Sequence, residues 1–331
     1  MIIKHLVIGG GGPNGFMFFG AMKYLKEKLF WNNDNIKSIY TTSAGSLIGT
    51  ILSLNYNLHD IEEYILKRPW DKLQPIDPEN ILNIWSEKGI FDEKFIYDIL
   101  NPLLKCLTLD SNINLKDFYE FNNIDLHIFT SKIKNGYFET VDLNHKTHPE
   151  LELYKAITMS SAFPIAFKPI EYNGEYYIDG GLCNNFPLNF CLNETKCNKN
   201  EILAINYSKK SDAENYVINN NTNVINYTMK IIFNMKYMIS NEHNQEKIKN
   251  IITMKNDYDD FTNWKKSYSN EEHRKYLLDK GKEYAINFLE SFEKNNHIDN
   301  NANEKNNANE KNNANEKNNA NEKNNHDIDK E

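Results

Sequence analysis

The chain has 331 residues, 40% of them apolar, so it is long enough for a large α/β domain with a substantial core. Its formal net charge of -8 disfavours nucleic acid as a partner, because binding a polyanion requires a basic surface. No apolar run reaches the roughly 18 residues of a membrane-spanning helix, and the first residues lack the pattern of a secretory signal peptide. We therefore expect a cytoplasmic protein without a transmembrane segment.

The first predicted elements surround a cluster of glycines. The apolar run of residues 2–8 precedes the four consecutive glycines 9–12, and a second apolar run begins at Phe16. This order predicts a strand, a tight turn and a helix, with backbone N–H groups of the turn free to approach an anion. The anion could be a phosphate or the oxyanion of acyl transfer. Alternatively, the glycines serve only to let the strand and the helix pack closely.

The second predicted strand, residues 36–42, ends at a serine. Ser43 is followed at once by an apolar helix, and the small residues Thr41 and Gly45 stand two positions to either side of it. This is the layout of a nucleophile elbow, in which a strained turn exposes the serine hydroxyl. A serine before an apolar helix is also a common N-cap. Taken alone, Ser43 fits both interpretations.

Nucleotide-binding interpretations of the glycines fit the sequence less well. Gly10, Gly12 and Gly15 match the dinucleotide fingerprint G-x-G-x-x-G, which is a weak signal by itself. That fingerprint requires an acidic residue at the end of the second strand, where residues 41–43 read TTS instead. A Walker-type loop requires lysine where Phe16 stands. We therefore expect no nucleotide cofactor, and the spacing of the four cysteines predicts no metal site.

A carboxylate is a better candidate base for Ser43 than any of the nine histidines, none of which lies in a catalytic motif. Residues 169–178 contain an Asn-Gly hairpin signal between two short strands, and Asp179 ends the second strand. Gly180 and Gly181 follow and allow a sharp turn. The aspartate could simply form an Asx-turn. Together with a glycine-rich anion loop and an elbow serine, it is a candidate general base.

The rest of the chain differs in composition. Residues 2–190 alternate strand-like and helix-like segments, which predicts βαβ units and a parallel or mixed sheet. Residues 194–295 carry apolar side chains at helical spacing, which predicts a helical extension packed on the core, with a membrane-lying helix as the alternative. The unit NNANEK repeats four times near the C-terminus, so residues 296–331 are predicted to be a disordered low-complexity tail.

Several motifs, taken together and in this order, resemble the patatin-like phospholipase family. The resemblance spans roughly residues 5–190 and rests on the segments GGGPNG (10–15), TTSAG (41–45), SSAFP (160–164), DGG (179–181) and NNFP (184–187). It implies a three-layer α/β/α sandwich over residues 5–193, with a mixed, mainly parallel sheet. It also implies a Ser-Asp dyad that hydrolyses acyl esters of lipids through an acyl-serine intermediate, without a histidine, cofactor or metal.

The resemblance assigns roles to particular residues. Ser43 would be the nucleophile and Asp179 its base, with small elbow and turn residues around them: Thr41, Gly45, Gly180 and Gly181. The oxyanion hole would be formed by the glycine loop: Gly10, Gly11, Gly12 and Gly15. The implied substrate is a phospholipid or another acyl-ester lipid at a membrane or droplet surface, reached by peripheral association.

Two positions depart from the family pattern. Thr41 replaces the first glycine of the elbow, and Asn14 replaces a basic residue that is common in the glycine loop. These departures motivate the alternative of a catalytically weak or inactive lipid-binding module. Aromatic residues such as Trp70, Trp85, Phe91 and Phe95 are expected either in the core or along an acyl channel.

Overall fold

The computed structural model describes residues 2–73, 84–208, 218, 222–243, 247–255 and 261–294. Contacts divide the chain into two units, Met1–Ala285 and Ile286–Glu331. All elements discussed below belong to the first unit, and the described residues of the second unit, 286–294, are helical. The predicted tail, residues 296–331, lies outside the described residues.

The described strands form two sheets. The main sheet has eight strands, seven of them in the order β10-β9-β1-β2-β4-β8-β7, with β5 paired to β4; the second sheet pairs β3 with β6. In chain order the strands are β1 (His5–Ile8), β2 (Ser38–Thr42), β3 (Gly89–Phe91), β4 (Asp125–Lys134), β5 (Tyr137–Leu143), β6 (Ile165–Phe167), β7 (Ile170–Tyr172), β8 (Glu175–Asp179), β9 (Ile202–Ser208) and β10 (Ile251–Lys255).

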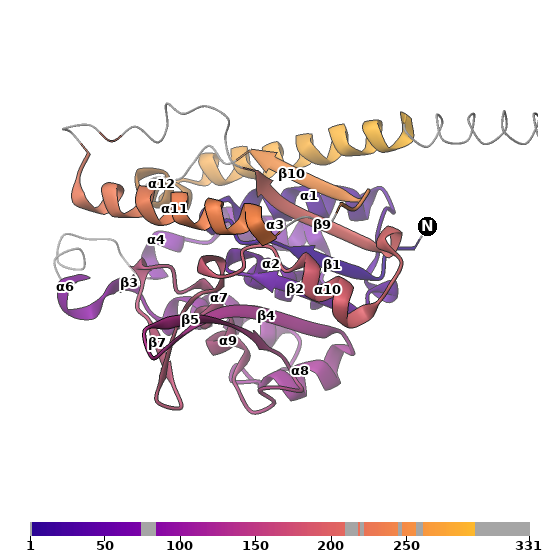
Figure 1. Cartoon of the computed structure of the whole chain (residues 1–331). Helices are drawn as coiled ribbons and strands as arrows, with labels where there is room; N and C mark the ends of the chain where they lie inside the picture. The colour runs from indigo at the N-terminus through magenta and orange to yellow at the C-terminus, as the bar shows by residue number, and fades with distance from the viewer. Residues whose placement is uncertain are drawn as a thin grey trace, which may run out of the picture. The chain divides into compact units, whose positions relative to one another are not determined.

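Helices cover both faces of the main sheet (Figure 1). The described α-helices are α1 (Gly15–Glu27), α2 (Ala44–Ser53), α3 (Leu58–Lys67), α4 (Trp70–Leu73), α6 (Ile84–Glu87), α7 (Glu93–Cys106), α8 (Leu115–Asn122), α9 (Leu153–Ser161), α10 (Leu188–Thr195), α11 (Val224–His243), α12 (Phe261–Ser269) and the helix of residues 271–285. Short 3-10 turns are η1 (Gly12–Asn14), η2 (Asn33–Asn35), η3 (Gly180–Leu182) and η4 (Lys199–Glu201).

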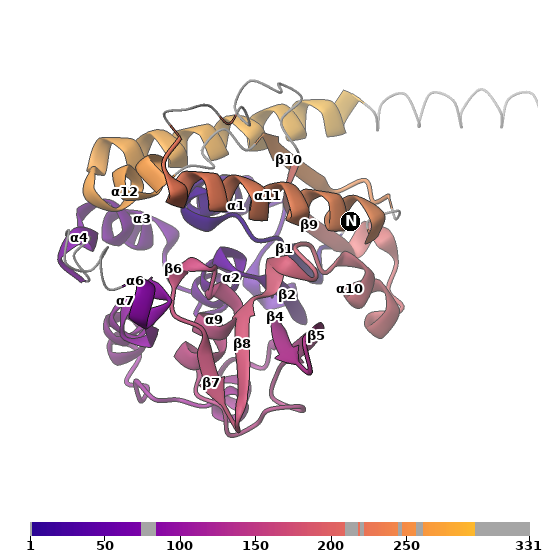
Figure 2. The same ribbon diagram turned by 60° about the vertical axis from the view of Figure 1, so that its left-hand side comes forward.

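The central strands are buried on both faces because helices cover both faces of the sheet. β1 and β2 are buried along their whole length and run parallel to each other, and β9 runs parallel to β1 on its other side. Val7 and Tyr40 pack in a cluster with Leu188 and Cys191 of α10, whereas Ile39 faces α2 on the opposite side. In Figure 2, α10 lies on one side of β1, β2 and β4, and α2 and α9 lie on the other. The predicted three-layer sandwich with a mixed sheet is therefore confirmed.

Strand β4 brings the ends of β2 and β8 together. β5 pairs with residues 128–134 along one edge of β4, so β2 and β8 share the other edge. β2 runs parallel to β4 and its last residue, Thr42, pairs with Phe129. β8 runs antiparallel and its last residue, Asp179, pairs with Thr130. The two strands therefore meet end to end on neighbouring residues of β4.

The segment expected to be a helical extension contributes strands as well as helices. β9 and β10 both fall within residues 194–295, and both join the main sheet as parallel strands next to β1. The same segment forms α11, α12 and the helix of residues 271–285. Within the described part of the chain, no helix has the length and apolar character needed to cross a membrane.

Candidate active site

Ser43 occupies the turn between β2 and α2. Its backbone (φ 54°, ψ -130°) lies in a region that is strained for a residue with a side chain. The N–H of Ser43 donates to Ser160 Oγ at 2.8 Å, and Ser160 Oγ donates to the carbonyl of Phe129 on β4 at 2.6 Å. Ser43 is the N-cap residue of α2, yet its side chain makes no capping hydrogen bond to the backbone of residues 44–53, all of which the structure describes. The geometry therefore favours the nucleophile elbow over the helix cap.

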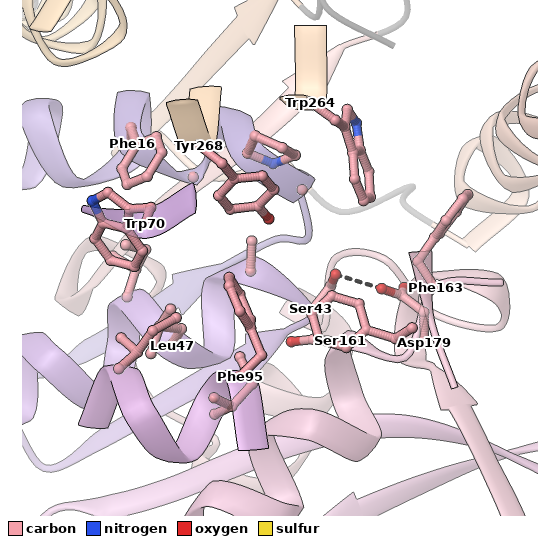
Figure 3. A pocket seen from close by; sticks show the side chains of 18 of the residues that line it. Phe16, Ser43, Leu47, Trp70, Phe95, Ser161, Phe163, Asp179, Trp264 and Tyr268 are labelled. Atoms are coloured by element: carbon pink, nitrogen blue, oxygen red, sulfur yellow. Dashed lines mark hydrogen bonds between the residues drawn. The ribbon is translucent and has the colours of Figure 1, made fainter. Parts of the chain in front are cut away.

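The side chain of Ser43 points to Asp179 instead (Figure 3). Ser43 Oγ lies 2.5 Å from Asp179 Oδ2, a short hydrogen bond between residues 136 positions apart in the chain. The other carboxylate oxygen, Oδ1, accepts the N–H of Gly181 at 2.7 Å. Asp179 therefore forms the Asx-type turn that its position before two glycines predicts, and it also holds the serine. Ser43 is 5% exposed and Asp179 is 1% exposed, so the pair is shielded from bulk water.

The elbow accommodates Thr41 through a glycine in the following helix. A Cβ at Gly49 would lie 2.6 Å from Thr41 Cγ2, so the missing side chain of Gly49 makes room for the methyl group. Thr41 Oγ1 donates to the carbonyl of His127 at 2.8 Å. A Cβ at Gly45 would lie 2.5 Å from the carbonyl oxygen of Ile8, so this elbow position requires glycine. Thr41 therefore changes the packing of the elbow without displacing Ser43 from Asp179.

The four glycines expected in the oxyanion hole differ in what their N–H groups do. Gly10 donates to the carbonyl of Asn185 at 3.0 Å, and Asn185 Nδ2 donates back to the carbonyl of Gly10 at 3.2 Å. The N–H of Gly15 donates to the carbonyl oxygens of Gly12 and Pro13 in the η1 turn. Among the described residues, the N–H groups of Gly11 and Gly12 have no acceptor. Of these two glycines, Gly12 lines the same pocket as Ser43 and Asp179.

A tyrosine from β9 anchors the glycine loop. Tyr207 Oη donates to the carbonyl of Asn14 at 2.5 Å, and its ring stacks on Phe18 with 4.6 Å between centroids. A Cβ at Gly11 would lie 2.3 Å from Tyr207 Cε2, so Gly11 lets the ring approach the loop. Asn14, which replaces the family's basic residue, is thus held through its backbone. The contact of Tyr207 with the glycine loop was not predicted from the sequence, because β9 was expected to be part of a helical segment.

Ser43 and Asp179 lie in the wall of an apolar pocket. Nine of its 19 lining residues come from four helices that are distant in sequence: α2, α7, α11 and α12. Figure 3 shows Phe95 and Leu47 on one side of Ser43 and Trp264 and Tyr268 above it. The lining residues are Gly12, Pro13, Gly15, Phe16, Ser43, Ala44, Leu47, Ile48, Trp70, Phe95, Ile96, Ile99, Ser161, Phe163, Phe167, Asp179, Phe233, Trp264 and Tyr268.

The aromatic residues singled out in the sequence divide between wall and core. Trp70 and Phe95 line the pocket, whereas Phe91 packs behind Phe95 with 4.6 Å between ring centroids. The side chain of Trp85 lies outside the described residues. No motif or spacing predicted that Phe233 and Trp264 line the pocket, because their helices reach it only through tertiary packing.

One polar group in the pocket wall is unsatisfied. Ser161 is 8% exposed and lines the pocket, and its hydroxyl has no hydrogen-bond partner among the described residues. Figure 3 shows Ser161 beside Ser43, with its oxygen directed into the cavity. A buried hydroxyl without a partner is unfavourable unless a ligand or water satisfies it. Ser161 can therefore contact a polar atom of a bound molecule.

His127 is a buried histidine outside the pocket. Among the described residues that line the pocket, none is a histidine. His127, 1% exposed, stacks on Tyr40 and pairs with Asp142 through Nδ1 at 2.7 Å and with Asp125 through Nε2 at 3.3 Å. Burial alone would lower the pKa of His127, but the contacts and charges of Asp125 and Asp142 outweigh it and raise the pKa to about 9. His127 is therefore a buried cation that holds β4 and β5 together.

Two groups of described residues place metal-binding side chains within 4.8 Å of one another: His5 with Cys197 and Glu201, and Asp125 with His127 and Glu194. The charges in both groups are paired within the protein, because Glu201 bonds to Lys4, and Asp125 pairs with His127 and Lys146. None of these residues lines the pocket.

A family model described as patatin-like phospholipase matches residues 6–192, which is more than half of the chain. The chain belongs to the patatin-like phospholipase family. The resemblance inferred from the motifs is thus confirmed. The patatin-like match begins in β1 and ends in α10, so it contains Ser43 and Asp179, whereas β9, α11 and α12 lie beyond it.

Among curated proteins, this patatin-like chain is similar to a probable lipid hydrolase, 463L, of Invertebrate iridescent virus 6. The two are 29% identical over 194 residues, which cover 57% of this chain and 63% of the viral protein. It is also similar to an intracellular phospholipase A2 of Caenorhabditis elegans, at 27% identity over 221 residues, covering 64% of this chain and 18% of the nematode protein. The chain thus spans less than two thirds of either relative.

Among solved structures, this patatin-like chain is similar to VipD of Legionella pneumophila. The match covers 84% of this chain and 67% of the VipD chain, with 16% sequence identity and a TM-score of 0.44.

Proposed function

We propose that the protein is a lipid acyl hydrolase of the phospholipase A or esterase type, which cleaves acyl esters with Ser43 as nucleophile and Asp179 as its base. The observation that carries the proposal is the 2.5 Å contact between Ser43 Oγ and Asp179 Oδ2 at the wall of an apolar pocket. Family membership and the names of the relatives support the same class of reaction.

In the first half of the reaction, Asp179 takes the proton of Ser43 as Oγ attacks the carbonyl carbon of the ester. The carbonyl oxygen becomes an oxyanion, and the N–H groups of Gly11 and Gly12 stabilise it. One such donor contributes typically about 10²- to 10³-fold in rate. The bond from the carbonyl carbon to the alcohol oxygen then breaks, and the alcohol leaves with the proton that Asp179 held.

In the second half, Asp179 deprotonates a water molecule, which attacks the acyl-serine. The bond between the acyl carbon and Ser43 Oγ breaks, the fatty acid leaves, and the proton returns to Ser43. The apolar wall of the pocket is suited to the acyl chain. The substrate class is therefore a phospholipid or another acyl-ester lipid presented at a membrane or droplet surface.

The alternative is a catalytically weak or inactive module that binds lipid without cleaving it. Its motivation was the presence of Thr41 and Asn14. The space left by Gly49 accommodates Thr41, and Tyr207 anchors the backbone of Asn14. Because both departures are accommodated, we favour hydrolysis. A cytoplasmic location with peripheral association with membranes stays a prediction.

The test measures hydrolysis of mixed phospholipid vesicles and of a short-chain ester by the purified protein. We expect Ser43→Ala and Asp179→Asn each to lower turnover by about 10³-fold or more, and a fluorophosphonate to label Ser43 in competition with lipid. Ser53→Ala is the matched control, because Ser53 is a buried serine of α2 whose hydroxyl bonds to the carbonyl of Thr50. Full activity in Ser43→Ala protein would refute the assignment. Lipid binding without turnover by the unaltered protein would instead establish the binding-only alternative.

A further inference from the structure

Helix α11 (Val224–His243) has two apolar sides. Met229 and Phe233 are buried, at 1% and 7% exposure, and face the core. The outer side of the helix carries four exposed apolar residues, at 38% to 66% exposure. We call these residues the α11 face: Val224, Tyr227, Ile231 and Met235. Their spacing of three and four positions places them in one stripe, about 16 Å long at 1.5 Å per residue.

The inner side of the same helix forms part of the pocket. Phe233 lines the pocket and stacks on Phe163, with 4.9 Å between ring centroids. The neighbouring helix α12 contributes Trp264 and Tyr268 to the wall. Figures 1 and 2 both show α11 beside α12, and the two helices are in contact. The exposed stripe and the wall of the pocket are thus opposite sides of one helical layer.

The charge of this layer is opposite to that of the whole chain. Helices α11 and α12 together contain four lysines and one acidic residue, Glu242, although the chain carries a net charge of -8. Lys265 and Lys266 of α12 are exposed, and Lys230 of α11 is partly exposed. An apolar stripe flanked by lysines is typical of a helix that lies in the interface of an anionic bilayer. The same lysines would repel each other if the faces of two copies met.

We propose that the α11 face docks on a bilayer containing anionic phospholipid, with Lys230, Lys265 and Lys266 contacting the headgroups. The choice of a lipid surface rests on the proposed function, because the pocket behind α11 is the one assigned to the acyl chain. Docking by this face brings the bilayer against the helical layer that walls the pocket. Core-facing and membrane-lying helices were the two alternatives for this segment, and in this proposal α11 combines the two.

The first experiment uses full-length protein carrying Ser43→Ala, so that binding is measured without hydrolysis and independently of the dyad's role. Co-sedimentation is measured with vesicles of phosphatidylcholine alone and of phosphatidylcholine with phosphatidylserine. We expect binding to the anionic vesicles. Adding Ile231→Asp and Met235→Asp should weaken it by at least about 10-fold, because two apolar side chains are replaced by charges that avoid the interface.

The matched control for the apolar residues is Phe138→Asp, since Phe138 lies on β5 and is 59% exposed. It should leave vesicle binding unchanged. The thermal unfolding midpoint of each variant shows that it is folded. Absence of binding by the Ser43→Ala protein, or an equal loss in the Phe138→Asp control, would overturn the proposal whether or not the unaltered protein hydrolyses lipid.

The second experiment reverses charges. Lys265→Glu with Lys266→Glu should weaken binding to the anionic vesicles by about 25-fold or more, since each lysine near such a surface contributes about fivefold. Lys116→Glu with Lys134→Glu, at exposed positions of α8 and β4, is the matched control and should have a much smaller effect. Equal losses in the two pairs would show that net charge, and not this surface, governs binding, and would contradict the proposal.

Discussion

The hydroxyl of Ser160 accepts the backbone N–H of Ser43 at 2.8 Å, and it thereby ties the strained turn to β4. Ser160 also lies 2.9 Å from Ser46 Oγ, so one buried side chain joins the turn, the following helix and the sheet. The turn has an unfavourable φ of 54°, which persists only where surrounding contacts hold it. Ser160 is therefore a positioning residue for the proposed nucleophile.

We predict that Ser160→Ala lowers kcat by about 10- to 100-fold with a smaller effect on KM, because small displacements of a reacting group have effects of this size. The rate of fluorophosphonate labelling of Ser43 should fall in parallel. The change also leaves the Ser43 N–H without its acceptor, which destabilises the fold by about 1 to 3 kcal/mol. Unchanged labelling kinetics in folded Ser160→Ala protein would contradict the positioning role.

Thr41 and Gly49 form a second coupled pair. A Cβ at residue 49 would lie 2.6 Å from Thr41 Cγ2, closer than side chains approach each other. Gly49→Ala should therefore destabilise the protein by about 1 to 3 kcal/mol, as overpacking of a core does. Thr41→Ser removes that methyl group and keeps the hydroxyl that bonds to His127. Gly49→Ala should consequently be less destabilising in the Thr41→Ser background.

A double-mutant cycle of urea unfolding measures this coupling. We expect the free energy of unfolding of the double variant to exceed the value obtained by adding the two single effects, by more than about 0.5 kcal/mol. Strict additivity would show that Thr41 and Gly49 do not compete for space. The residual destabilisation should come from Ile39, whose Cγ2 lies 3.1 Å from the same Cβ position.

Ser43 and Asp179 could be singled out from the sequence because each lies in a short local motif. Ser43 and Asp179 each follow a strand directly, and such residues gather at strand ends of an α/β sheet. The contact itself depends on β8 running antiparallel on the same edge of β4 as β2, which neither motif encodes. Gly49 could have indicated the close packing of α2 on β2, since a glycine inside an apolar helix often marks a close approach of another element.

The remainder of the site could not be predicted in the same way. Tyr207, Phe233 and Trp264 reach the glycine loop and the pocket from segments that follow the family match. Their roles depend on packing between elements far apart in sequence. β9 was expected to be helical because later residues of the same segment carry apolar side chains at helical spacing. Its run ILAINY is a short buried strand, which periodicity alone does not distinguish from part of a buried helix.

His127 gives the fold a pH dependence of known sign. Its pKa is raised from about 6.5 to about 9 in the folded protein, since the contacts and charges of Asp125 and Asp142 outweigh its burial. The folded state therefore binds more protons than the unfolded state between these values. This contribution to stability is complete below about pH 6.5 and is lost as the pH rises through about 9.

We predict that His127→Gln flattens the decline of the unfolding free energy between pH 6.5 and 9. Over this pH range the contribution that His127→Gln removes is about 3.5 kcal/mol at most, because the pKa rises from 6.5 to about 9 and one pKa unit corresponds to about 1.4 kcal/mol. Urea unfolding at several pH values measures it. His59→Gln is the control, because His59 is exposed on α3. An identical decline in His127→Gln and unaltered protein would be evidence against a buried imidazolium.

Ser161 differs from Ser160 in having no internal partner for its hydroxyl among the described residues. Ser161→Ala should therefore leave the unfolding free energy unchanged or slightly higher, because it removes an unsatisfied buried group. The same change should lower kcat/KM for phospholipid by about 5- to 10-fold if the hydroxyl donates to the bound ester, which is the size of one such hydrogen bond. The opposite pattern, lost stability with full activity, would show that Ser161 is a packing residue and not a contact for substrate.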